Sequence, residues 1–358
     1  MKRQIGFFCL ALSLATPHLS GQKPSSPTDA AGAATHDTSY IDAQGAAHVT
    51  RVVPLPQTIS DEARRYLARQ ISDQAVSEPL ADRRSHTDAL AQSQAEGWKK
   101  LCAVNMAEQK IAGVPVRVVT PDTMPEANRG KVLINLHGGG FNSDAGSFSE
   151  TIPIAGFSGM KVVAVLYRLA PENHYPAQVE DAIAVYKELL KSYAPERIGI
   201  YGTSAGAVIT GQVAVRLKHL GLPEPGALGI FSGHGDFARI GDSQGIFGIP
   251  GLSGHMDVPR EVPHTSDYLQ GADPRDPLVS AIYSDLHGLP PTLFVSSGRD
   301  VLQSGTTVLH RAFLNAGVDA RLIVFEGLPH AFWYDPSLPE SVEANRDMAA
   351  FFLRQLSR

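Results

Sequence analysis

The chain has 358 residues, a formal net charge of −5 and a hydrophobic fraction of 43%. This length is enough to bury one large core or two modest ones, and single α/β domains often reach it. The mild acidity and the lack of a basic run argue against a nucleic acid as partner.

The N-terminus has the pattern of an export signal. Lys2 and Arg3 precede the apolar run Ile5–Ala15, which is too short to span a bilayer comfortably. We expect residues 1–21 to be a secretory signal peptide, so that the mature chain is periplasmic or secreted and keeps no stable membrane span. A disordered or membrane-tethering N-terminus is the alternative. Processing would leave Cys102 as the one cysteine, without an internal disulfide.

The rest of the chain divides by its patterning. Residues 22–56 are rich in small and polar residues without an apolar period, so we expect a loosely ordered arm. Residues 57–110 carry two helical patterns, the second over about 84–106, which we interpret as N-terminal cap helices. Over residues 111–358, apolar β-rich runs alternate with helical stretches. This alternation predicts an α/β fold with a mostly parallel sheet covered by helices on both faces.

The expected strands are 114–120, 131–136, 161–166, 197–201, 227–231, 292–296 and 321–325, and the expected helices are 177–193, 205–219, 303–316 and 339–355. Residues 232–290 break this alternation, because they are dense in Gly, Pro, Asp and His. A loop of this length in a compact domain is usually functional. We expect it to form a cap or lid together with the helices before residue 107.

The segment Gly202–Gly206 reads Gly-Thr-Ser-Ala-Gly and lies between an expected strand and an expected helix. G-x-S-x-G arises by chance in about one chain in four of this composition, so the motif alone is weak. A strand–turn–helix strengthens it, because the tight elbow excludes bulky neighbours and exposes the serine at a helix N-terminus. We therefore predict Ser204 as a nucleophile.

A second glycine-rich segment, His137–Phe141, follows the strand expected at 131–136 and reads His-Gly-Gly-Gly-Phe. H-G-G-G is expected by chance in only about one chain in a hundred. Successive glycines let the backbone present N–H groups to a ligand, and a tetrahedral acyl-transfer intermediate needs such donors for its oxyanion. We predict Gly138, Gly139 and Ala205 as these donors, with the histidine bracing the loop.

Serine needs a base to take its proton and a carboxylate to orient that base. In sheets with such an elbow, the acid and then the base follow later strands. The last expected strand runs into Glu-Gly-Leu-Pro-His, which places His330 just beyond its end. The preceding strand runs into Ser-Gly-Arg-Asp, which gives Asp300 the matching position. We predict His330 as the base and Asp300 as its orienting carboxylate.

Other acids and histidines fit these roles less well. Asp273, Asp276 and Asp285 lie in or near the irregular segment, and Asp319 precedes the last strand instead of following it. His310 falls within an expected helix, where an exposed or packed histidine is ordinary.

Taken together, these motifs resemble the hormone-sensitive-lipase-like family of α/β-hydrolases over residues 110–356. The resemblance rests on His137–Phe141, Tyr167–Glu172, Tyr175–Ala177, Gly202–Gly206 and the segments around Asp300 and His330. It implies the α/β-hydrolase fold, a cap of N-terminal helices and inserted segments, and a preference for esters with short to medium acyl chains. Thr203 resembles the branch whose elbow reads Gly-Thr-Ser-Ala-Gly. Family members often form homodimers, so the resemblance adds a homodimer to the expectations.

Two positions depart from the family pattern. Many members carry Asp-x-Leu-x-Asp at the acid, whereas here Ser304 occupies the second acidic place, so that only Asp300 can act there. Ala207 stands where many relatives have glycine.

We therefore expect a carboxylic ester hydrolase that acts on small-molecule esters through an acyl-enzyme and needs no cofactor. Hydrolysis of lactones or peptides is the nearer alternative, because the acyl-enzyme chemistry is shared and the pocket decides. A non-catalytic binding protein on the same fold is more distant, and the presence of His330 argues against it. A metal site is not expected, since the His-x-Asp groups at 234–236 and 255–257 lack ligand spacing.

Overall fold

The computed structural model describes residues 38–68, 79–248 and 267–357, and the predicted signal peptide, residues 1–21, lies outside this part. The chain divides into two compact units, residues 1–54 and 55–358. The described part of the first unit contains an antiparallel hairpin of β1 (Thr38–Ile41) and β2 (Ala47–Thr50). At its turn, Asp42 accepts the N–H groups of Gln44 and Ala46 at 2.9 Å. This hairpin falls within the segment that was expected to be a loosely ordered arm.

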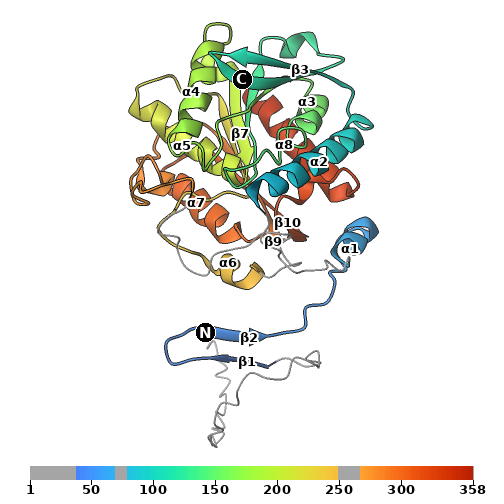
Figure 1. The fold of residues 1–358 in the computed structure, drawn as a ribbon, viewed down its shortest axis with the longest axis vertical. Helices are drawn as coiled ribbons and strands as arrows, with labels where there is room; N and C mark the ends of the chain where they lie inside the picture. Colours follow the sequence, from blue (N-terminus) through green and yellow to red (C-terminus); the bar gives the residue numbers. More distant parts are fainter. Residues whose placement is uncertain (1–37, 69–78, 249–266, 358) are drawn as a thin grey trace, which may run out of the picture. The chain divides into compact units, whose positions relative to one another are not determined.

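The second unit is built on a sheet in the order β10-β9-β8-β7-β5-β6-β4-β3 (Figure 1). The strands from β10 to β6 run parallel, and β4 and β3 continue the sheet antiparallel. The bounds are β3 Val104–Ile111, β4 Val114–Pro121, β5 Val132–Leu136, β6 Lys161–Val165, β7 Ile198–Thr203, β8 Ala227–Phe231, β9 Thr292–Arg299 and β10 Ala320–Pro329. All of β5 to β8 except Lys161 is buried, as parallel strands are when helices cover both faces.

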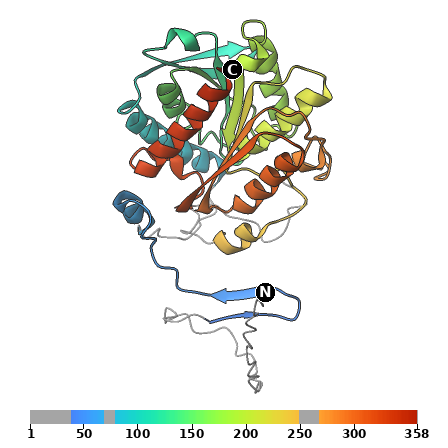
Figure 2. The same ribbon diagram turned by 180° about the vertical axis from the view of Figure 1, so that it is seen from behind.

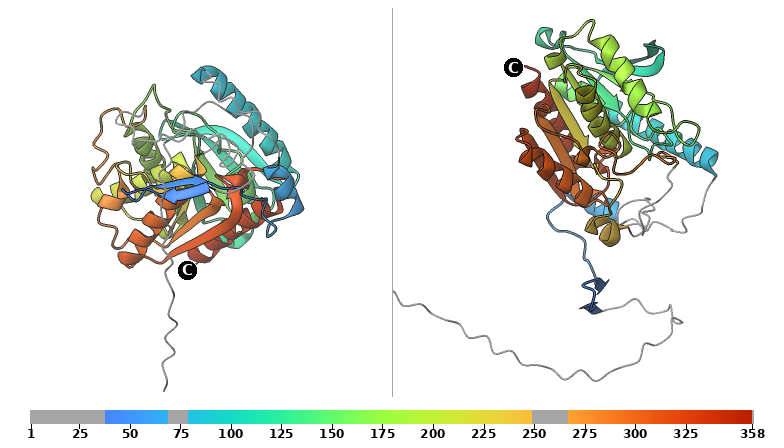
Figure 3. Two further views of the ribbon diagram at one scale, coloured as in Figure 1. Left: turned by 90° about the horizontal axis from the view of Figure 1, so that it is seen from below. Right: turned by 90° about the vertical axis from the view of Figure 1, so that its left-hand side faces the viewer.

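Helices cover both faces of this sheet, as the opposite views in Figures 1 and 2 and the further views in Figure 3 show. One face packs against α4 (Ala177–Leu189), α5 (Ala205–His219) and α7 (Gln303–Asn315). The other face packs against α1 (Asp61–Leu67), α3 (Ile152–Ser158) and α8 (Pro339–Gln355), and α2 (Leu80–Lys99) lies against α3. No helix in the described ranges is both long and apolar enough to cross a membrane.

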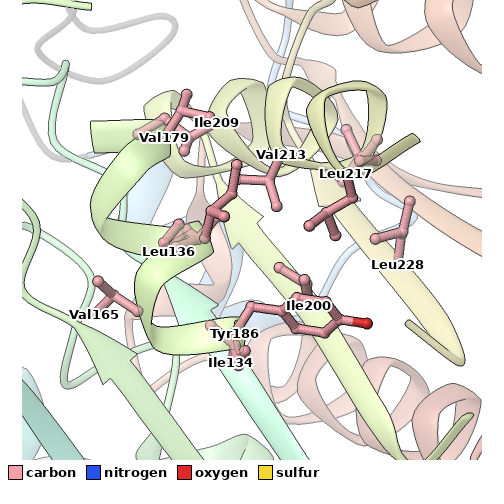
Figure 4. Packing of buried hydrophobic residues seen from close by; sticks show 14 of the residues in the cluster. Ile134, Leu136, Val165, Val179, Tyr186, Ile200, Ile209, Val213, Leu217 and Leu228 are labelled. Carbon is pink, nitrogen blue, oxygen red and sulfur yellow. The ribbon is translucent and has the colours of Figure 1, made fainter. Parts of the chain in front are cut away.

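The core under α5 shows why this helix packs on the sheet (Figure 4). Ile209, Val213 and Leu217 recur every four residues, so they share one helix face, and all are at most 1% exposed. They belong to one buried cluster with strand side chains such as Ile134 and Ile200. Each such buried side chain stabilises the fold by about 1.5–3 kcal/mol, and this layer holds the start of α5 against the strand ends.

The structure corrects the sequence prediction at one edge of the sheet. The second N-terminal helix was expected to continue to about residue 106, but α2 ends at Lys99 and Val104–Ile111 forms the edge strand β3. Most of β3 is solvent-exposed and its sequence is polar, so it lacks the apolar signal of a buried strand. The described parts of the predicted lid, 232–248 and 267–290, contain helix α6 (Asp242–Phe247) and the 3₁₀ helix η3 (Ala281–Tyr283).

Removal of one ring from the α8 face should destabilise the fold strongly. Phe352 is 0% exposed, and its ring centroid lies 5.5 Å from that of Tyr201 in β7. We expect Phe352→Ala to lower the free energy of unfolding by about 3–5 kcal/mol, because it leaves a cavity between α8 and the sheet. Val324→Ala, at a position 45% exposed on β10, is the control and should change it by about 0.5 kcal/mol or less. Equal losses in urea denaturation would contradict this assignment of the core.

Candidate active site

Ser204 occupies a strained turn between the end of β7 and the start of α5. Its backbone has φ 57° and ψ −120°, a combination that is sterically unfavourable for a residue with a side chain. Its N–H donates to the carbonyl of Phe231 at the end of β8 (2.9 Å), and its carbonyl accepts the N–H of Val208 (3.1 Å). These bonds fix the serine at the edge of the sheet where the parallel strands end, as the sequence predicted.

The two glycines of the elbow allow a contact that no side chain permits. A Cβ atom on Gly206 would lie 1.7 Å from the carbonyl oxygen of Leu136, the last residue of β5, and one on Gly202 would lie 2.2 Å from the same oxygen. The first turn of α5 therefore touches the end of β5 through backbone alone. This contact sets the elbow directly beside the loop that begins at His137.

The loop after β5 uses its glycines in different ways. Gly139 and Gly140 have φ of 126° and 61°, and a Cβ on Gly139 would lie 2.1 Å from the carbonyl of Ser143. The N–H of Gly138 donates to Glu150 Oε1 at 2.8 Å. That bond conflicts with the predicted role of Gly138 as an oxyanion donor, because its proton already has a buried acceptor.

Several backbone N–H groups near the elbow, those of the first turn of α5 included, have no acceptor within the described part of the chain, and three of them are candidate oxyanion donors. These three belong to Gly139, Gly140 and Ala205. Ala205 is the first residue of α5, where a helix leaves its N–H groups unpaired and carries partial positive charge. Gly140 thus replaces Gly138 in the predicted set of donors, and no sequence signal distinguishes these two glycines.

His330 and Asp300 meet as the sequence predicted. His330 Nδ1 lies 2.7 Å from Asp300 Oδ1, and the carboxylate is 0% exposed. Asp300 also accepts bonds from Ser232 Oγ, from Ser296 Oγ at 2.8 Å and from the N–H of Leu302 at 2.9 Å. Burial alone would raise the pKa of Asp300, but the nearby His330 and these bonds outweigh it, so the pKa lies below its ordinary value. The ionised carboxylate then holds the ring proton on Nδ1 and leaves Nε2 of His330 as the acceptor.

The loop that carries the histidine is tied to the elbow. Trp333 Nε1 donates to Oγ1 of Thr203, the residue before the serine, at 3.2 Å. On the other side, Ser297 Oγ donates to the carbonyl of Pro329 at 3.0 Å, which joins the loop to β9. Because β7, β9 and β10 run parallel, their carboxyl ends lie at one edge of the sheet, and the three predicted side chains follow those ends.

The rival acids have other partners. Asp273 and Asp276 accept N–H groups within their own turns, at 2.8 Å each. Asp285 pairs with Lys218 at 2.7 Å, and Asp319 lies 3.6 Å from an arginine. Nε2 of His310 lies 3.3 Å from the backbone carbonyl oxygen of Ala320, the first residue of β10. The described residues contain no cluster of three or more His, Cys, Asp or Glu side chains that could hold a metal.

An aromatic cluster that no local sequence pattern predicts includes the residue that ends the glycine loop, Phe141. The Phe141 ring stacks on Tyr268 at 3.8 Å between centroids, and Phe237 lies 5.9 Å from Tyr268. His234 meets Phe237 edge-on at 4.8 Å, and burial lowers the pKa of His234 to about 4, so this ring is neutral at pH 7. The cluster joins the residue after Gly140 to the turn after β8 and to the segment of Tyr268.

Comparison with known proteins places the chain among hydrolases. A family model described as α/β hydrolase fold matches residues 133–334. An acetyl-hydrolase of Streptomyces hygroscopicus is 34% identical over 64% of this chain and 77% of its own length. An esterase of Acinetobacter venetianus is 27% identical over 63% and 76%.

Solved structures agree with this placement. An esterase from the bacterial hormone-sensitive lipase family matches with a TM-score of 0.72 and 28% identity, over 83% of this chain and 99% of that one. A hormone-sensitive lipase from a metagenome library matches with a TM-score of 0.69 and 28% identity, over 78% and 94%.

The contact between α5 and β5 can be tested with two glycines of one helix. Gly206→Ala should lower the free energy of unfolding by about 1–3 kcal/mol, since its Cβ would overlap backbone atoms that cannot rotate away. Gly211→Ala is the matched control, because its Cβ would lie an ordinary 3.6 Å from Ala281. It should be neutral, or stabilise the helix by up to about 1 kcal/mol. Similar effects of both changes in thermal or urea unfolding would refute the close contact.

Proposed function

The chain belongs to the hormone-sensitive-lipase-like family of α/β-hydrolases, and on that premise we propose that it is a carboxylic ester hydrolase with Ser204 as its nucleophile. The observation that carries the proposal is the 2.7 Å bond between His330 and the buried Asp300 at the sheet edge that also bears the strained serine. Relatives called acetyl-hydrolase and esterase support the same activity.

In the acylation step, Ser204 Oγ attacks the ester carbonyl carbon while its proton passes to Nε2 of His330. Asp300 stays ionised and stabilises the imidazolium that forms. The carbonyl oxygen becomes an oxyanion, which can accept hydrogen bonds from the N–H groups of Gly139, Gly140 and Ala205. Each such donor contributes roughly 3–4 kcal/mol to transition-state stabilisation in enzymes of this chemistry.

The tetrahedral intermediate then collapses, and the alcohol leaves with the proton that His330 held. A water molecule next attacks the acyl-enzyme, and Nε2 of His330 takes its proton. The second collapse returns that proton to Ser204 and releases the carboxylic acid. The protein's own side chains supply every proton transfer in this sequence.

The substrate class we propose is esters with short to medium acyl chains. Phe141 directly follows Gly140, a proposed oxyanion donor, and its ring contacts those of Phe237 and Tyr268. An uncharged aromatic cluster next to the glycine loop would favour an apolar acyl group and limit its length. We also propose that residues 1–21 direct export of the chain, which the basic and then apolar N-terminal pattern supports. Formation of a homodimer is a further part of the proposal, supported by the homodimers that are frequent in the family.

Hydrolysis of p-nitrophenyl esters from C2 to C16 tests the activity. We expect the highest kcat/KM within the short to medium chains, with a decline toward C16. Ser204→Ala should lower kcat by at least about 10⁴-fold, because no nucleophile remains to form the acyl-enzyme. A wild-type protein that hydrolyses none of these esters, or a variant as active as the wild type, would refute the proposal.

A substitution that keeps the size of the Asp300 side chain tests the role of its negative charge. Asp300→Asn keeps the size of the side chain but removes the charge that holds the Nδ1 proton of His330. We expect kcat to fall by about 10⁴-fold with little change in KM. Asp276→Asn is the control, since an amide oxygen can still accept the N–H of Leu278, and its kcat should stay within twofold. An active Asp300→Asn variant would assign the orienting acid elsewhere.

A further inference from the structure

Glu150 is a buried carboxylate next to the site that the mechanism does not use. Its side chain is 2% exposed and lies just before α3. Its Oε1 accepts the N–H of Gly138 at 2.8 Å and the hydroxyl of Tyr334 at 2.5 Å, and its Oε2 accepts Asn135 Nδ2 at 2.7 Å. Three donors thus converge on one carboxylate in the protein interior.

These three partners belong to different parts of the site. Gly138 lies at the start of the loop after β5 that carries the proposed oxyanion donors, the oxyanion loop. Tyr334 lies four residues after His330, and Asn135 is in β5. The backbone carbonyl of Glu150 also accepts the hydroxyl of Tyr201, in the strand that leads into the elbow, at 2.7 Å. One residue therefore contacts the oxyanion loop, the histidine segment and the nucleophile strand.

Two glycines of the loop after β5 pack closely against this carboxylate and its tyrosine partner. A Cβ atom on Gly146 would lie 1.9 Å from Glu150 Oε1, and one on Gly138 would lie 2.5 Å from the Tyr334 hydroxyl. Both close approaches require glycine. The site for the Glu150 side chain is therefore built by the backbone of the oxyanion loop itself.

A buried carboxylate without a direct cationic partner is costly, so its retention calls for a reason. Burial raises the pKa of Glu150 to about 7 even though its three hydrogen bonds lower it, and the nearby Asp144 raises it further. The titratable and charged groups on the surrounding elements are His137, Asp144, Arg117, Tyr167, Tyr201 and Tyr334. Hydrogen bonds to a carboxylate are roughly twice as strong as those to a neutral acceptor.

We propose that Glu150 is a positioning residue whose carboxylate couples the oxyanion loop to the segment of His330. Its bond to Gly138 fixes the peptide that precedes the donors Gly139 and Gly140, and its bond to Tyr334 fixes the helix turn that follows the base. This inference rests on the proposed esterase function, because the coupling matters only if oxyanion donors and base act on one acyl group.

The network can accommodate a neutral side chain at position 150, which makes the inference testable. Oδ1 of Asn135 is buried and has no partner among the described residues. Rotation of this amide would present Oδ1 to a protonated Glu150, or to the amide of a Glu150→Gln variant. The oxygen facing Gly138 and Tyr334 would then be a neutral, weaker acceptor. Glu150→Gln should therefore fold and imitate the protonated state.

The decisive measurement is kcat for a short-chain p-nitrophenyl ester between pH 5.5 and 9. Active sites are counted first with an organophosphonate that labels the serine, so that misfolded protein does not enter kcat. In the wild type, loss of the Glu150 proton as pH rises steepens the acid limb of the profile. Glu150→Gln should lower kcat per active site by about 5- to 20-fold at pH 8, leave KM within twofold and make the acid limb shallower.

Two further variants separate positioning from a general loss of structure. Tyr334→Phe removes one donor from the carboxylate, so the pKa of Glu150 should rise and the acid limb should move to higher pH. Glu224→Gln is the matched control, since burial also raises the pKa of Glu224 to about 7 and its oxygens have no bonding partner in the described structure. It should leave kcat and the pH profile unchanged.

A Glu150→Gln variant with wild-type kcat per active site and an unchanged acid limb would overturn the inference. The same holds if Glu224→Gln alters the profile as strongly, because the effect would then be one of buried charge in general. Failure of the esterase proposal would look different, since the wild-type serine would then not be labelled and no ester would be hydrolysed.

Discussion

The arrangement of the site depends on the direct backbone contact between the first turn of α5 and the last residue of β5. Gly206 can approach the carbonyl of Leu136 because it has no Cβ, and this approach leaves Ser204 on a turn with φ 57°. A larger residue would push the helix away from the strand and take the nucleophile away from the glycine loop. The energetic cost of the strained backbone at Ser204 is offset by the buried face of α5, where successive turns pack against the sheet.

The parallel sheet brings the other proposed reacting groups to the edge where this contact lies. Strands that run in one direction end at one edge, so loops distant in the sequence converge there without long connections. Asp300 and His330 follow neighbouring strands, and Ser232, which follows β8 between them and the elbow, donates to the acid. The hydrogen bond from Trp333 to Thr203 then links the last loop back to the elbow. The proposed acid, base and nucleophile thus follow separate strands, and hydrogen bonds join the loops that carry them.

The sequence predicted most of the buried sheet, together with Ser204, Asp300 and His330, because these depend on short-range signals. Apolar β-rich runs indicate buried strands, and a polar or glycine-rich residue directly after such a run lies at the sheet edge. β3 escaped prediction because it is an exposed edge strand with a polar sequence. The choice among the glycines of the oxyanion loop also escaped, since it depends on Glu150, whose contact with Gly138 comes from packing and not from a local pattern. The same holds for the aromatic cluster of Phe141, Phe237 and Tyr268, which joins three separate segments.

Glu150 shows how such a site can require a group that the fold alone would not favour. Its pKa in the folded protein, about 7, exceeds the ordinary 4.5, so the folded state binds the proton more tightly than the unfolded chain does. Its contribution to stability is therefore greatest at low pH and is lost as pH rises through about 7. The same ionisation creates the stronger acceptor for Gly138 and Tyr334. Around neutral pH, ionisation of Glu150 thus strengthens its hydrogen bonds to the oxyanion loop and to Tyr334 but lowers the free energy of unfolding. A purely structural role for Glu150 would not account for this combination.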